Sequence, residues 1–151
     1  METIEKSVEV LKDLIEINTD RVTGFSRASK DLSADDNDLR NLFTMFAGDS
    51  RDNVQELGGI INQLGGDAET GSSALGTIHR AWLDIKATFS GHDRKSILEE
   101  CERGEDAIKK AYRDALKEEG LSGDIIAVIA KQQQKINEGH DRIKALRDSA
   151  V

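Results

Sequence analysis

The chain has 151 residues, of which 37% are hydrophobic, 33% are charged and only 4% are aromatic. Its formal net charge of −8 makes nucleic acid and anionic membrane surfaces poor partners, because both repel an acidic protein. Proline, the strongest helix breaker, is absent, so the composition favours long helices around an aliphatic core. A single domain over residues 1–151 is the simplest organisation for this length.

Two long helices are expected in the N-terminal part of the chain. Apolar residues recur every three or four positions from Thr3 to about Leu32, which is the pattern of one buried helix face. A polar break at 33–36 offers several N-caps, and a second stripe of the same kind continues to Leu64. The glycine pair at 65–66 is the expected end of that second helix.

A shorter helix and two more long helices are expected in the rest of the chain. Ser73 is placed to cap the shorter helix, which ends before the break at 90–92. Asp93 is placed to cap a long helix that runs to about Glu119, and either Ser122 or Asp124 opens the last one. No stretch shows the alternation of a strand, so the fold class is all-α.

The lengths of the breaks predict how the helices are connected. The two short breaks, near residues 34 and 121, each join long helices, and each pair should therefore form an antiparallel hairpin. The link between the hairpins carries its own helix, which allows a crossover. The expected architecture is an antiparallel four-helix bundle with an additional crossover helix between its two hairpins.

Each long helix interrupts its apolar stripe with polar residues near its middle. Folding each hairpin about its break brings these residues to similar heights, so they could meet in one central layer. Buried polar groups cost about 1–3 kcal/mol each when they are left unsatisfied, so such a layer must be hydrogen-bonded, hydrated or bound to a metal. The members of the expected polar layer are Asn18, Ser50, Asn53 and Cys101, with Asp49, Glu105 and His140 beside them.

A structural, hydrogen-bonded layer is the favoured interpretation of these residues. The alternative is a single iron or manganese ion with Glu105 and His140 as ligands and with Asp49 or Glu102 behind them. A full di-iron centre is the third option, and it would need two Glu-x-x-His pairs, which the chain lacks: the residue three before His140 is Asn137. No certain cofactor is therefore expected.

The crossover helix carries the other candidate surface, formed by Trp82, Ile85 and Phe89. The simpler role for these side chains is to dock the crossover helix onto the bundle. The alternative is that they form an interface between subunits. The lone Cys101, the absence of a signal sequence and the absence of a long apolar run are typical of a cytoplasmic protein.

Several runs resemble a known family. They are Ile78-His79-Arg80-Ala81-Trp82-Leu83-Asp84-Ile85-Lys86, Glu100-Cys101-Glu102-Arg103-Gly104-Glu105-Asp106, Leu14-Ile15-Glu16 with Asp20 and Gly24-Phe25, and His140-Asp141-Arg142-Ile143 with Leu146-Arg147-Asp148. The chain is similar here to a bacterial family of uncharacterised ferritin-like four-helix-bundle proteins. The resemblance covers nearly the whole chain and implies a ferritin-like fold and a bacterial, cytosolic setting. It implies no activity.

The expected function is that of a non-enzymatic bundle protein, structural or stress-associated, which forms a homo-oligomer and keeps a vestigial metal site in its polar layer. One alternative is a metal-binding protein or weak di-metal oxidase that takes its missing ligands from solvent or from a second subunit. The other is an adaptor that holds a partner helix through the crossover helix.

Overall fold

The computed structural model describes residues 3–66 and 93–150. These residues form four α-helices and no strand: α1 (Thr3–Asp31), α2 (Asn37–Gln63), α4 (Arg94–Leu116) and α5 (Gly123–Ser149). Their lengths of 23–29 residues correspond to about 35–43 Å. The expected all-α class and the four long helices are confirmed; the expected helix at 73–89 lies outside the described residues.

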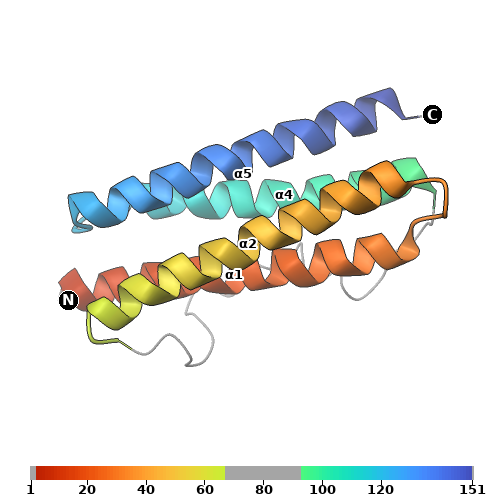
Figure 1. Cartoon of the computed structure of the whole chain (residues 1–151). Helices are drawn as coiled ribbons and strands as arrows, with labels where there is room; N and C mark the ends of the chain where they lie inside the picture. The colour runs from red at the N-terminus through yellow and green to blue at the C-terminus, as the bar shows by residue number, and fades with distance from the viewer. Residues whose placement is uncertain (1–2, 67–92, 151) are drawn as a thin grey trace.

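The four helices lie side by side as two antiparallel pairs, α1 with α2 and α4 with α5 (Figure 1). The pairs join through α1 against α4, whereas α2 and α5 meet along a sparser contact. α2 and α4 run in the same direction, as do α1 and α5 (Figure 1). Each helix therefore has an antiparallel neighbour on both sides of a four-membered ring.

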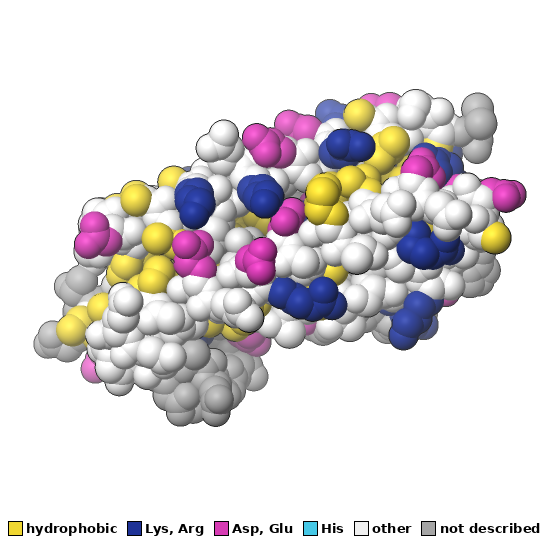
Figure 2. Space-filling model, viewed as in Figure 1, with side chains coloured by type: hydrophobic (Ala, Val, Ile, Leu, Met, Phe, Trp, Pro, Cys, Tyr) yellow, Lys and Arg dark blue, Asp and Glu magenta, His cyan; other side chains and the backbone are white. Residues whose placement is uncertain are grey.

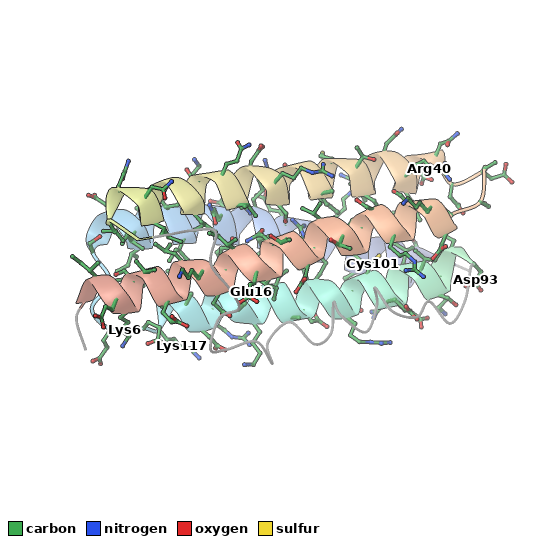
Figure 3. All side chains as sticks on the ribbon, turned by 90° about the horizontal axis from the view of Figure 1, so that it is seen from below. Lys6, Glu16, Arg40, Asp93, Cys101 and Lys117 are labelled. Carbon is green, nitrogen blue, oxygen red and sulfur yellow. The ribbon has the colours of Figure 1, made fainter. Side chains whose placement is uncertain are left out.

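Ion pairs mark the two ends of the bundle. At one end Arg94 bonds to Asp36 and Asp38, so the start of α4 lies against the turn between α1 and α2. At the other end Lys6 lies 3.1 Å from Glu118. Figure 3 shows the same arrangement, with Arg40 and Asp93 at one end and Lys6 and Lys117 at the other. α2 therefore ends, and α4 begins, at opposite ends of the bundle.

Local chemistry explains where the helices begin and end. The side chain of Asp93 accepts a hydrogen bond from the Ser96 amide, and Ser122 accepts one from the Ile125 amide, so these two caps are confirmed and Ser122 takes precedence over Asp124. The polar break at 33–36 supplies Asp36 as the N-cap residue of α2, but its side chain makes no capping hydrogen bond. α2 ends as expected before Gly65, whose φ of +82° suits glycine.

α4 is shorter at its C-terminus than the sequence predicts. It ends at Leu116 rather than near Glu119, because the amides of Lys117 and Glu118 bond to the carbonyls three residues before them instead of four. This tighter turn closes the helix before Gly120, where φ is +89°.

The core between the helices is aliphatic except at one cluster of rings. Phe25 lies 5.1 Å from Phe43 and 5.4 Å from Phe46, measured between ring centroids. All three are buried, and they fill the space between α1 and α2 directly beside the polar centre of the bundle.

Among the described residues, no helix is both long enough and apolar enough to cross a membrane.

Candidate functional site: two polar layers in the bundle core

A buried ion pair lies at the centre of the bundle. The Arg21 guanidinium on α1 donates two hydrogen bonds to the Glu105 carboxylate on α4, from Nε to Oε1 at 2.7 Å and from Nη2 to Oε2 at 2.9 Å. Arg21 is 1% exposed and Glu105 is 0% exposed, so water contributes almost nothing to the solvation of either charge. The pair has the bidentate geometry in which arginine holds a carboxylate most strongly.

The neighbouring helices complete the surroundings of the Arg21 guanidinium. Its Nη1 donates to the Ser50 hydroxyl at 3.0 Å and to the Phe46 carbonyl at 3.3 Å, both on α2. The rings of Phe25 and Phe46 lie 5.3 and 5.2 Å from the guanidinium carbon, within the range of cation–π attraction. Hydrogen bonds and aromatic faces thus replace the water that Arg21 loses on folding.

The fourth helix approaches this pair through Gly139. A Cβ atom at this position would lie 3.0 Å from Nη2 of Arg21 and 3.3 Å from Oε2 of Glu105. Real Cβ atoms rarely approach that closely, so glycine lets α5 lie directly against the ion pair. All four helices therefore contribute to this layer, which we call the ionic layer: Arg21, Ser50, Glu105 and Gly139.

A second layer lies about one turn closer to the N-terminus of α1, at Asn18. Asn18 donates to the Tyr112 hydroxyl at 2.9 Å, and Tyr112 donates to Oε1 of Gln132 at 2.7 Å. Gln132 then donates to Glu56 at 2.8 Å, and Asn53 donates to Asn18 at 3.1 Å. The chain of bonds leaves α2 at Asn53, passes through α1, α4 and α5, and returns to α2 at Glu56.

This second chain of bonds is called the amide belt below. Asn18, Tyr112 and Gln132 are buried, whereas Glu56 lies at the surface. Glu56 and Gln132 also line a groove between α2 and α5 with a volume of about 290 Å³, together with Asp49, Asp52, Asn53, Lys131 and Lys135. The belt thus connects the core to the side of the bundle where α2 and α5 contact each other least.

Burial changes the acid–base behaviour of two side chains near the layers. Burial raises the pKa of the Tyr112 hydroxyl well above its ordinary value of 10, and the hydrogen bond from Asn18 opposes this only in part. Burial also raises the pKa of the Cys101 thiol, and the nearby carboxylates of Glu105 and Glu100 add to that effect. Cys101 is therefore held as a neutral thiol, which is a poor nucleophile.

Tyr112 provides a direct test of the amide belt, because it is the only tyrosine in the chain. We expect no tyrosinate absorbance to appear in the folded protein at pH 10, whereas the chain unfolded in denaturant should titrate at about pH 10. Above that pH the folded state binds more protons than the unfolded state, so the free energy of unfolding should fall as the pH rises. A folded-state midpoint near 10 would contradict the buried hydroxyl, and Tyr112→Phe should remove the signal.

The residues that the sequence suggested as metal ligands have separate partners in the structure. Glu105 bonds to Arg21, Glu102 to Arg147, and Asp49 lies 3.2 Å from Lys135. His140 has Nε2 2.6 Å from Asp106 and Nδ1 3.1 Å from Asp141. In the ranges 3–66 and 93–150 no three His, Cys, Asp or Glu side chains form a group that could hold a metal ion.

The expected polar-layer residues divide between the two layers. Asn18 and Asn53 belong to the amide belt and Ser50 to the ionic layer, while Cys101 is buried on α4, one turn from Glu105. Sequence reasoning missed Arg21, Tyr112 and Glu56. Arg21 had a signal, because it lies three residues after Asn18 and four before Phe25, on the buried face of α1.

The candidate interface residues Trp82, Ile85 and Phe89 lie outside the described residues, as do His79 and His92.

Comparison with known proteins gives one family match. The model described as "Domain of unknown function (DUF2383)" matches residues 6–118. This range contains α1, α2 and α4, and with them Arg21, Ser50 and Glu105. No curated protein matches the chain.

Proposed function

The chain belongs to the DUF2383 family, and we propose that it is a non-enzymatic, ferritin-like bundle protein with a structural or stress-associated role. In this proposal an ion pair occupies the central position that metal-binding bundles give to a metal. The observation that carries it is the bidentate contact of Arg21 with Glu105, in which both groups are at most 1% exposed. The bacterial and cytoplasmic setting remains part of the same proposal.

The connectivity supports the ferritin-like part of the proposal. α2 and α4 run in the same direction, and α2 ends at the opposite end of the bundle from the start of α4. The chain must therefore pass from one end of the bundle to the other between its two hairpins. A four-helix bundle with one such long connection has the topology of ferritin-like folds.

The donor atoms at the centre do not fit a di-metal site. Both oxygens of Glu105 accept hydrogen bonds from Arg21, so a divalent cation would have to displace a buried guanidinium and then lie beside its charge. Glu102, Asp49 and His140 have other partners, and no Glu-x-x-His pair occurs in the sequence. These contacts favour a structural centre over a metal-binding protein or a weak oxidase.

Metal titration tests this proposal. Protein purified without chelator should contain less than one iron or manganese per chain, and titration with either ion should reveal no stoichiometric site. Glu105→Gln and His140→Ala should bind no more and no less metal than the wild type, and ferrous iron should not be oxidised faster with the protein than without it. Uptake of one or more ions per chain that either substitution abolishes would replace our proposal with the metal-binding alternative.

Self-association through Trp82, Ile85 and Phe89 is also part of the proposal. It is supported by the sequence alone, since these residues lie outside the described part of the structure. The same holds for the adaptor alternative, which uses the same segment.

A further inference from the structure

A groove on the outer side of the α1–α2 pair has a composition that neither polar layer explains. Its volume is about 300 Å³, and α1 and α2 supply all of its lining. Three of the lining side chains are cations, three carry hydroxyl groups, and none is a carboxylate. The lining residues are Phe25, Ser26, Ser29, Lys30, Arg40, Phe43, Thr44, Ala47 and Arg51. We call this the basic groove.

The positive charge of the basic groove contrasts with the rest of the molecule. The formal net charge is −8, and the groove on the opposite side of α2 contains three carboxylates, Asp49, Asp52 and Glu56, beside two lysines of α5. Figure 2 shows dark blue side chains without magenta neighbours where the first half of α2 lies beside α1, whereas magenta and dark blue side chains are interspersed toward α5. The positive electrostatic potential at the basic groove therefore attracts small anions to this face.

The cations of the groove differ in how they are held. Arg40 donates to the side chain of Asn37 at 2.6 Å and to the carbonyls of Leu32 and Ser33, so its charge has a fixed position. Lys30 and Arg51 are exposed, and within the described residues no ion pair engages either of them. In the part of the chain that the structure describes, these two cations are therefore available to an incoming anion.

The groove also offers a place for an apolar group. A second hollow, of about 320 Å³, shares Arg51 with the basic groove, and its walls include Val22 and Val54. Arg51 therefore lines both a cationic hollow and a more apolar one. A ligand that carries an anionic group at one end and an apolar group at the other would match this sequence of surfaces.

We propose that the basic groove binds the phosphate monoester of a small organic molecule. A phosphate dianion is attracted by the cations that line the groove more strongly than a monovalent carboxylate is, and arginine binds phosphate oxygens through paired N–H groups. Ser26 and Ser29 supply hydroxyl donors beside these cations. The volume lies at the lower limit for ligand pockets, which favours a compact ligand.

Calorimetric titration of the full-length protein with phenyl phosphate tests this proposal, with phenol as the ligand that lacks the phosphate. We expect phenyl phosphate to bind and phenol not to bind. Arg51→Gln and Lys30→Gln should each weaken binding about tenfold, as expected for a lost charge-assisted hydrogen bond. Arg103→Gln is the matched control, because it removes an exposed cation on α4 and should leave the affinity unchanged.

Vesicles that contain phosphatidic acid distinguish a lipid source of the same phosphate chemistry. If they bind the protein, if Arg51→Gln abolishes that binding, and if phenyl phosphate competes, the site stands and its natural ligand is a lipid headgroup. The proposal is overturned if phenyl phosphate does not bind, or if Arg103→Gln weakens binding as much as Arg51→Gln does. None of these outcomes depends on whether the core binds metal.

Discussion

Arg21→Met should lower the free energy of unfolding by about 3–5 kcal/mol, because it leaves the Glu105 carboxylate buried without its partner. The loss should greatly exceed that of an exposed arginine such as Arg103, whose substitution by methionine we expect to change stability by less than about 0.5 kcal/mol. Urea denaturation followed by circular dichroism measures both values.

A variant that replaces both partners distinguishes two costs: the loss of the attraction between Arg21 and Glu105, and the burial of one charge without its partner. Glu105→Leu alone should also be strongly destabilising, since it leaves the guanidinium without its counter-ion, but Arg21→Met with Glu105→Leu should recover much of the loss. Buried ion pairs that are replaced by apolar groups of similar volume often cost little stability. Additive losses in the double variant would contradict this account of the ionic layer.

Gly139→Val should also destabilise the protein, with a loss of about 1–3 kcal/mol in the free energy of unfolding. Its Cβ would lie within 3.4 Å of Arg21, Glu105 and Phe46, and the branched side chain would force α5 away from the ion pair. The charged groups cannot yield easily, because each is held by several bonds. Thermal denaturation of the variant measures the loss.

Gly48 provides the matched control for this substitution. It also lies inside a helix, α2, but a Cβ atom there would have no neighbour within 4 Å. Gly48→Ala should therefore stabilise the protein by up to about 1 kcal/mol through helix propensity, whereas Gly139→Ala should fail to show that gain. Equal gains at both positions would show that α5 is not held against the ion pair as described.

The helices could be predicted from the sequence because their signals are local. Apolar spacing of three and four residues, the capping residues Asp93 and Ser122, and the glycines after α2 and α4 each act within one or two turns. The error at the end of α4 also has a local cause, the change to three-residue hydrogen bonds after Leu116. Such a change leaves little trace in composition, so the helix was expected to continue.

The organisation of the polar centre could be predicted only in part. Asn18, Ser50 and Asn53 were visible as polar interruptions of apolar stripes, but which of them meet depends on the relative rotation and height of four helices. Glu105 was expected in a polar layer, with a metal ion as the alternative partner, because its buried position was evident and its actual partner was not. Arg21 was overlooked, and long-range pairing between residues 84 positions apart cannot be read from a single helix.

The hydrogen bonds of the amide belt begin and end on α2 and pass through α1, α4 and α5. The α1–α2 hairpin and the α4–α5 hairpin therefore depend on each other for stability. A separated α1–α2 hairpin would retain the Asn53–Asn18 bond but would lose Tyr112, and it would also expose an arginine whose counter-charge belongs to the other half. Neither half then has a satisfied interior by itself, which disfavours half-folded intermediates. The protein should therefore unfold in one cooperative step, and slow amide hydrogen exchange should be distributed over all four helices rather than confined to one hairpin.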